Sequence, residues 1–353
     1  MDYKIQIVRT SGKEVEASIL LIYTGGTIGM VRSESGAFAP FNFSSALEKI
    51  PELKELDLQI TMVSFPELVD SSDFGPDHWK SLGAIIYDNY DRYDGFVVLH
   101  GTDTMAYTAS ALSFMFQGLD KPIILTGAQI PIGELRSDAR ENLITAIQMA
   151  SAMEDGESVI KEVAIYFNFA LIRGNRSQKV RSSTFAAFES QNYPRLAGSG
   201  IFIEYFKRNF LAPKRKKLNY RAAFDPNVLL IKIFPGLCQA SFEHLLTMKG
   251  LKGIVIETFG SGNAMKEAWL YSGLKKVIEQ GVVVLNVSQC SGGEVIQGRY
   301  ESSKMFDDVG VIGGGDITTE AAITKMMFLL GTEKNAKSIK RKLQQPLVGE
   351  MDA

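Results

Sequence analysis

Short apolar runs rich in β-branched residues alternate with longer segments of helical periodicity in the first half of the chain. The runs fall at residues 18–23, 58–63, 95–99, 122–125 and 163–167, and they are typical of buried strands in a parallel sheet. Between them, apolar side chains recur every three or four positions at residues 77–89, 104–117 and 137–153, which predicts helices. The alternation predicts a doubly wound, mostly parallel α/β domain, whose ligands bind beyond the carboxyl ends of the strands.

The alternation stops between residues 196 and 224. Gly198, Gly200, Pro213 and the basic run 214–217 predict an exposed connector with a solvated charge cluster. A second, shorter series follows, with strands expected at 228–234, 253–257 and 282–287 and helices at 241–248, 265–279 and 318–330. We therefore expect an N-terminal α/β domain over residues 1–195, a connector over 196–224 and a smaller C-terminal α/β domain over 225–353.

Composition narrows the class of protein and of partner. The 353 residues are 45% hydrophobic and 22% charged, which excludes disordered, collagen-like and disulfide-scaffold proteins. Lys plus Arg number 38 against 40 Asp plus Glu, a net charge of −2, so no cationic field favours a nucleic acid or a membrane surface. A small-molecule ligand fits this balance better.

The cysteines and the apolar runs bear on location. The chain has two cysteines, Cys238 and Cys290, a usage typical of a reducing compartment. Residues 1–18 mix charged and apolar positions, unlike a signal peptide. The longest apolar runs fall far short of the ~20 residues that cross a bilayer. These features predict a cytoplasmic protein.

Four predicted strand ends run into turns rich in glycine and hydroxyl groups. They are residues 23–29 (YTGGTIG), 100–105 (HGTDTM), 126–129 (TGAQ) and 258–264 (TFGSGNA). Glycine lets the backbone approach a ligand and present its N–H groups. A single turn of this kind is more often a tight corner, but three in one domain predict a crevice that binds a small molecule.

Several common catalytic motifs are missing from the sequence. His78, His100 and His244 lack the spacing of zinc ligands, so no metal is expected. No G-x-S-x-G elbow, P-loop or G-x-G-x-x-G fingerprint occurs, which disfavours an α/β-hydrolase and a nucleotide site. His100, placed directly after a predicted strand, is typical of a packed strand-end histidine rather than of a general base.

The remaining reactive groups are Thr27, Thr102, Asp103 and Lys179, which suffice for nucleophilic acyl transfer. A neutral Lys179 near pH 7 would need its pKa lowered by ~3 units, or ~4 kcal/mol, and a paired aspartate opposes that change. A relay through threonine, lysine and aspartate avoids storing charge on the lysine. A lysine such as Lys179, taken alone, is more often an exposed loop cation, and the sequence does not place it beside Thr102.

Residues 23–30 (YTGGTIGM) and 100–105 (HGTDTM) resemble the two signature segments of bacterial L-asparaginases of the cytoplasmic type I group. Residues 70–73 (DSSD) resemble the substrate loop of that family, and 173–179 (RGNRSQK) resemble the segment that presents its catalytic lysine. Residues 288–290 (SQC) and 310–314 (GVIGG) extend the resemblance through the second domain.

The resemblance implies hydrolysis of L-asparagine to L-aspartate and ammonia through an acyl-enzyme, without a metal or organic cofactor. It makes Thr27 the nucleophile and groups Thr102, Asp103 and Lys179 as the second catalytic set. The substrate-binding residues that it implies are Asp70, Ser71, Ser72, Thr102, Asp103, Ala128 and Asn263. Backbone N–H groups near Thr102 and Ala128 would form an oxyanion hole, and Asn263 would reach a neighbouring subunit, which implies a homodimer or homotetramer.

The chain departs from the family pattern at three places. Residues 36–40 (GAFAP) lack the loop tyrosine that contacts the nucleophile in related enzymes. Some members of the family bind a second asparagine as an activator, through a threonine and an arginine at positions where this chain has Gln178 and Glu257. Of the residues of that second site only Cys290 matches, so allosteric activation is not expected. Glu294 and Glu301 are candidates for an acidic group contributed by an adjacent subunit.

Two other functions fit the same residues. The asparaginase-like subunit of a tRNA-dependent amidotransferase carries similar motifs but has an added domain before the first turn, where this sequence has residues 1–18. A non-catalytic regulator that binds an amino acid would show saturable binding without release of ammonia. The presence of two threonine hydroxyls beside an aspartate and a lysine favours the enzyme.

Overall fold

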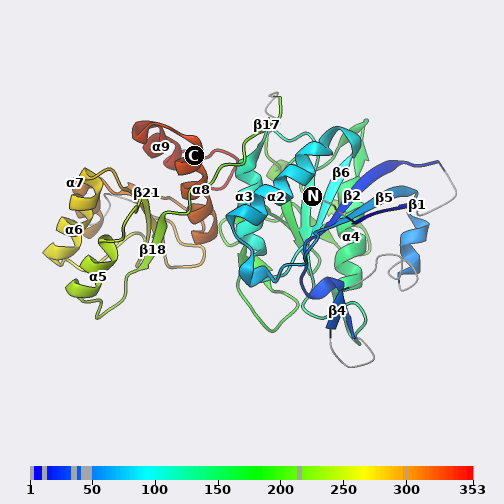
Figure 1. Cartoon of the computed structure of the whole chain (residues 1–353), viewed down its shortest axis with the longest axis horizontal. Helices are drawn as coiled ribbons and strands as arrows, with labels where there is room; N and C mark the ends of the chain where they lie inside the picture. Colours follow the sequence, from blue (N-terminus) through cyan, green and yellow to red (C-terminus); the bar gives the residue numbers. More distant parts are fainter. Residues whose placement is uncertain are drawn as a thin grey trace. The chain divides into compact units, whose positions relative to one another are not determined.

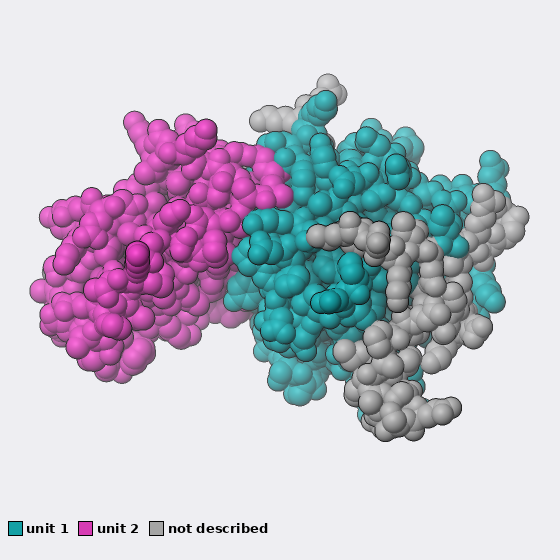
Figure 2. Space-filling view, in the orientation of Figure 1, with its two compact units in different colours: residues 1–190, 194–220 teal, residues 191–193, 221–353 magenta. Residues whose placement is uncertain are grey.

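The computed structural model describes residues 4–9, 14–32, 38–40, 50–212, 217–296, 298 and 301–352. The chain forms two compact units (Figure 2). The first comprises residues 1–190 and 194–220, and the second comprises residues 191–193 and 221–353. Each unit has its own sheet.

The sheet of the first unit has nine strands in the order β1-β5-β2-β6-β8-β11-β12-β15-β16. Their bounds are β1 (Lys4–Arg9), β5 (Leu58–Ser64), β2 (Ala17–Tyr23), β6 (Gly95–Leu99), β8 (Ile123–Thr126), β11 (Val163–Phe167), β12 (Ala170–Arg173), β15 (Ala197–Ser199) and β16 (Ile203–Tyr205). The five strands from β5 to β11 are parallel, and the outer pairings are antiparallel. The predicted strands of the parallel centre are confirmed.

The helices of the first unit pack on this parallel centre. They are α2 (Pro76–Asp88), α3 (Met105–Met115) and α4 (Ala139–Ser151). Helix α2 begins at Pro76, whose fixed φ suits a first helical position. Helix α3 is buried at nearly every position, including the hydroxyl residues Thr108, Ser110 and Ser113. Helix α3 contacts α2 and β11, whereas α4 packs on β2, β6, β8 and β11. Helices α2 and α3 lie side by side in Figure 1.

Short ribbons accompany the main sheet. They pair β3 (Met30–Arg32) with β4 (Phe38–Pro40), β9 (Met153–Glu154) with β10 (Glu157–Ser158), β13 (Gln178–Lys179) with β14 (Phe188–Glu189), and β7 (Phe116–Gln117) with β17 (Asn219–Tyr220).

Strand register brings three of the glycine-rich turns to one edge of the sheet. Tyr23 at the end of β2 is paired with Leu99 at the end of β6, and Leu99 is paired with Thr126 at the end of β8. Because these strands are parallel and end level, the segments that follow them leave from neighbouring points. This edge is where a doubly wound sheet binds its ligands.

The second unit is a smaller α/β domain, as predicted. Its parallel strands β18 (Val228–Lys232), β19 (Gly253–Thr258), β20 (Val283–Ser288) and β21 (Ile312–Gly313) lie in chain order. The helices are α5 (Gln239–Leu246), α6 (Ala268–Glu279), α7 (Glu301–Val309), α8 (Thr319–Thr332) and α9 (Ala336–Leu343). Phe242, Leu270 and Phe306 belong to its buried core.

The structure differs from the connector expected over residues 196–224. Strands β15 and β16 extend the main sheet from within that segment, and β17 returns to pair with β7 at the end of α3. Tyr220 stacks on Tyr87 with ring centroids 4.3 Å apart. Strands β15, β16 and β17 have only two or three residues each. A pattern of apolar positions cannot be recognised in the sequence over so few residues. Within the predicted basic run, residues 214–216 lie outside the described residues.

Candidate active site

The turn after β2 carries Thr27 and rests on the turn after β6. Gly25 and Gly26 adopt φ values of +129° and +88°, a region that favours glycine, and Thr27 opens a short 3₁₀ turn. A Cβ atom on Gly26 would lie 2.5 Å from the Cα of Gly101. The backbone beside Thr27 therefore touches the backbone beside Thr102.

Tyr23 supports this turn from within the protein. Its hydroxyl donates to the Gly26 carbonyl at 3.4 Å, and its ring fills the space that a Cβ of Gly29 would need. Burial raises the pKa of Tyr23 to about 12, so the phenol stays neutral.

The segment predicted to lack the family's loop tyrosine is described only in part. Residues 36–37 lie outside the described residues, and residues 38–40 form β4.

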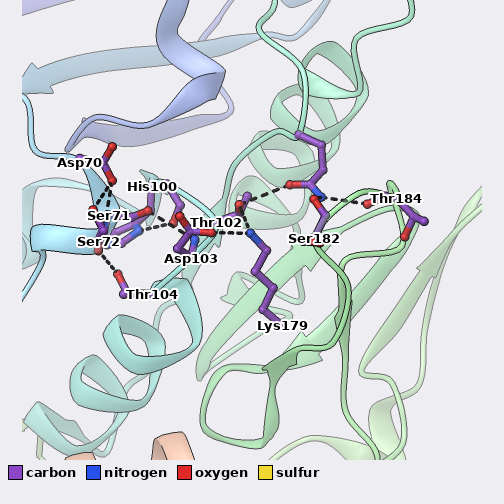
Figure 3. Close-up of polar contacts among 12 residues, drawn as sticks. Asp70, Ser71, Ser72, His100, Thr102, Asp103, Thr104, Lys179, Ser182 and Thr184 are labelled. Atoms are coloured by element: carbon purple, nitrogen blue, oxygen red, sulfur yellow. Dashed lines mark hydrogen bonds and ion pairs between the residues drawn. The ribbon is translucent and has the colours of Figure 1, made fainter.

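Lys179 joins Thr102 and Asp103 in one polar cluster (Figure 3). Its Nζ lies 2.7 Å from Thr102 Oγ1 and 2.7 Å from Asp103 Oδ1. The side chain of Lys179 is 17% exposed, whereas that of Asp103 is 64% exposed. Lys179 is therefore not a free loop cation: it approaches the threonine from the β13–β14 ribbon, and its partner carboxylate remains open to solvent.

Gln129 is a polar neighbour of Thr102 that the sequence analysis missed. Its Nε2 donates to the carbonyls of Ser182 and Thr184 at 3.1 and 3.0 Å. These two acceptors fix the amide so that Oε1 faces Thr102 Oγ1, 3.3 Å away, and accepts the hydroxyl hydrogen. The available signal was the position of Gln129 directly after Ala128 in the third turn.

Asp138 holds the third turn in place. Its carboxylate accepts the backbone N–H groups of Gln129 and Ile130 at distances of 3.0 to 3.1 Å. Asn142 donates to the Gly127 carbonyl at 3.0 Å. These contacts fix the backbone on both sides of Ala128, which is buried.

The segment that begins at Asp70 is tied to the Thr102 turn. Asp70 Oδ1 accepts the backbone N–H and the hydroxyl of Ser72 at 2.9 and 2.8 Å, and these hydrogen bonds hold the pKa of Asp70 below its usual range. The Ser71 carbonyl accepts the Thr104 hydroxyl at 2.6 Å, and its Oγ accepts the Asp103 N–H at 3.4 Å. Asp70 thus stays ionised on a turn anchored beside Thr102.

Two family models together match most of the chain. The asparaginase N-terminal family model matches residues 18–210, and the glutaminase/asparaginase C-terminal domain model matches residues 227–343. The chain belongs to the asparaginase family. L-asparaginase 1 of Escherichia coli strain K12 is 39% identical to this asparaginase over 337 residues, which cover 95% of this chain and 98% of that protein.

Solved structures and further relatives extend the comparison. The crystal structure of L-asparaginase I from Vibrio cholerae matches with a TM-score of 0.85 and 40% identity, covering 96% of this chain and 99% of that one. A glutamyl-tRNA(Gln) amidotransferase subunit of Methanopyrus kandleri is 31% identical over 354 residues, which cover 95% of this chain and 75% of that protein.

Asn263 belongs to the second unit of the asparaginase, whereas the other predicted site residues belong to the first. Its turn is closed by a bridge between Phe259 and Asn263. Behind the turn, the buried Asn286 accepts the Thr258 hydroxyl at 2.6 Å and donates to the Gly262 carbonyl at 3.4 Å. The turn that carries Asn263 is therefore held from within its own unit.

Neither a metal-ligand cluster nor a membrane span occurs among the described residues. No group of three His, Cys, Asp or Glu side chains gathers there as metal ligands would. No helix in that part of the chain is both long and apolar enough to span a bilayer.

Proposed function

We propose that this asparaginase hydrolyses the side-chain amide of L-asparagine to L-aspartate and ammonia through an ester on Thr27. The observation that carries the proposal is the position of Lys179 Nζ, 2.7 Å from both Thr102 Oγ1 and Asp103 Oδ1. This cluster adjoins the turn that bears Thr27. The similarity to L-asparaginase 1 of E. coli supports the choice of substrate.

In the first half-reaction the Thr27 oxygen attacks the amide carbon. The C–N bond then breaks, and the threonine proton leaves with the amino group as ammonia. Backbone N–H groups at Thr102 and Ala128 would stabilise the oxyanion, an interaction whose loss typically lowers the rate by ~10²-fold or more. The fixed turns on both sides suit such donors because little reorganisation is needed.

In the second half-reaction water adds to the ester carbon and Thr27 leaves. Lys179, which donates to Thr102 and Asp103 at once, first passes a proton to Asp103, which frees Nζ to accept one. The Thr102 hydroxyl then turns from Gln129 to Lys179 and gives up its hydrogen as it takes the proton of the water. When the ester bond breaks, the Thr27 oxygen takes up the proton that Asp103 received, relayed back through Lys179 and Thr102, so the enzyme ends as it began.

The ends of the substrate would be held by the segment that begins at Asp70. The ionised Asp70 and the exposed Asp103 would bind the α-amino group, and Ser71 and Ser72 the α-carboxylate. Asn263 would reach the site of a second copy in a cytoplasmic homodimer or homotetramer. Glutamine, which carries one more methylene, would react more slowly.

The test is release of ammonia from asparagine by the purified protein, with glutamine in parallel. Thr27→Ala should abolish turnover while Thr27→Ser retains part of it. Lys179→Met should slow the second half-reaction, so the ester on Thr27 should accumulate. After rapid mixing with asparagine, mass spectrometry should then detect protein heavier by one aspartyl group. Full activity in Thr27→Ala would exclude the role given to Thr27.

The same experiment separates the alternatives. A component of a tRNA-dependent amidotransferase, suggested by the similarity to the M. kandleri protein, would require its tRNA-bound partner for turnover. A non-catalytic binding protein would bind asparagine saturably in calorimetry and release no ammonia.

A further inference from the structure

A buried chain of hydrogen bonds runs from α2 through α3 to the end of β6. The indole Nε1–H of Trp79 lies 3.2 Å from Thr108 Oγ1, and that oxygen lies 3.0 Å from His100 Nε2. The other ring nitrogen of His100, Nδ1, lies 2.7 Å from the Gly101 carbonyl oxygen. Trp79, Thr108 and His100 are all nearly inaccessible to solvent.

The chemistry of these partners fixes the proton on the His100 ring. A carbonyl oxygen only accepts, so Nδ1 must carry the hydrogen that it donates to Gly101. The indole of Trp79 only donates, so Thr108 accepts from Trp79. Burial lowers the pKa of His100 to about 4, so the ring is neutral and carries its one hydrogen on Nδ1. Nε2 therefore accepts the hydroxyl hydrogen of Thr108.

We propose that His100 is a positioning residue that orients the peptide between Gly101 and Thr102 for catalysis. In a trans peptide the carbonyl and the N–H of the same unit point in opposite directions. By holding the Gly101 carbonyl, His100 also directs the Thr102 N–H, the group assigned to the oxyanion hole. This inference rests on the proposed function, and it gives His100 no direct contact with the substrate.

The residues around Gly101 and the His100 ring leave both little room to move. Gly101 is packed so tightly that a Cβ atom would lie 2.5 Å from Ser71 Oγ. The rings of Phe74 and His100 are packed edge to face, with their centroids 4.4 Å apart. The nearby His78 adds to the lowering of the pKa of His100 through its charge. The imidazole is therefore confined on its apolar side and directed on its polar side.

The kinetic test compares two substitutions of His100. In His100→Asn a side-chain N–H can still reach the Gly101 carbonyl, and kcat should remain within about fivefold of wild type. His100→Leu has no donor, and kcat should fall by ~10²-fold with KM changed only a few-fold, because the misplaced N–H acts in the transition state. Equal losses of kcat in both variants would overturn the proposal.

Thr108→Val should lower kcat several-fold, because it leaves Nε2 without its donor. Its matched control is Ser110→Ala, which removes another buried hydroxyl of α3, one that donates to the Ala106 carbonyl of the same helix. A fall of kcat in Ser110→Ala equal to that in Thr108→Val would show a general packing effect and contradict the assignment.

Two further measurements distinguish positioning from acid–base chemistry. The pH profiles of kcat/KM for wild type and His100→Asn should have the same limbs; an inflection lost in the variant would identify His100 as a titrating base and refute the proposal. In ¹⁵N spectra of the histidine-labelled protein, the His100 signals should show hydrogen on Nδ1 and none on Nε2.

The spectra remain informative if the unsubstituted protein releases no ammonia, which would defeat the proposed function alone. In that case the Thr102 amide signal should shift in His100→Leu and keep its position in His100→Asn. A ring protonated at Nε2, or a Thr102 signal indifferent to His100, would exclude the positioning role.

Discussion

Gly26 and Gly101 meet backbone to backbone, with 2.5 Å between the Cα of Gly101 and the place where a Cβ of Gly26 would stand. The two glycines precede Thr27 and Thr102, each by one residue. Because neither glycine has a side chain, the turn that carries the proposed nucleophile can contact the turn that carries the proposed water-activating group. The glycines thus set the separation of the two proposed catalytic groups.

Gly26→Ala should therefore impair both stability and activity. The left-handed φ of +88° costs alanine about 1 kcal/mol or more, and the contact with Gly101 adds a clash, so we expect a loss of about 2 to 4 kcal/mol in urea unfolding. The turnover of the folded protein should fall ~10²-fold. Gly200→Ala, at an open hairpin position, is the control, with a stability change below about 1 kcal/mol. Normal kcat in Gly26→Ala would show that the close approach is dispensable.

Periodicity predicted the parallel centre of the large sheet because strands such as 95–99 and 163–167 are buried along their whole length. It missed the antiparallel edges for a physical reason. Strand β15 has only three residues, two of them Gly198 and Ser199, and backbone hydrogen bonds to β12 and β16 hold it in the sheet. Such pairing leaves little trace in the side chains.

The candidate site could be predicted as residue types but not as distances. The sequence places Thr102 and Asp103 together, whereas Lys179 reaches Thr102 from 77 positions away through the β13–β14 ribbon. Gln129 was missed because its role depends on the carbonyls of Ser182 and Thr184, and a carbonyl has no identity in a sequence. Tertiary contacts of this kind need coordinates.

Lys179→Met should lower kcat by ~10²- to 10⁴-fold, the range usual for loss of an acid–base group. Thr102→Val should act similarly, and the double variant should be little worse than either single change, because the two residues act as a unit. Initial rates of ammonia release measure these effects. Lys161→Met removes a cation that pairs with Glu157 at the surface and should leave kcat unchanged. Additive losses would indicate that Lys179 and Thr102 act separately.

Asp70→Asn should affect substrate binding more than turnover. The amide oxygen of the introduced side chain can still accept the Ser72 N–H, so the turn should persist. The substitution removes the negative charge that would bind the α-amino group of the substrate. A charged hydrogen bond contributes roughly 1.5 to 3 kcal/mol, so KM should rise by ~10- to 100-fold with kcat changed only a few-fold. Asp73→Asn, an exposed residue of the same turn, is the matched control. A fall in kcat at constant KM would remove Asp70 from the role of substrate anchor.

Lys325 and Glu350 form a fully buried ion pair in the second unit. Nζ lies 2.7 Å from Glu350 Oε1, and both side chains are 0% exposed. Lys325 also donates to the Gln345 carbonyl at 2.7 Å, while the Glu350 carboxylate accepts the backbone N–H groups of Leu347 and Val348. Burial lowers the pKa of Lys325, and the charge of Glu350 opposes that shift. The pair pins the C-terminal segment to α8.

Removing one partner should cost more than removing both charges. Lys325→Met leaves a buried, uncompensated carboxylate, and the free energy of unfolding should fall by about 3 to 5 kcal/mol. In the double variant Lys325→Met with Glu350→Gln, the neutral amide needs less solvation, so part of that loss should be recovered. Lys80→Met, which breaks an exposed pair with Asp77, should change stability by less than about 1 kcal/mol. Urea unfolding followed by circular dichroism measures all three, and a double variant less stable than Lys325→Met would mean that hydrogen bonding by Glu350, rather than charge balance, anchors the segment.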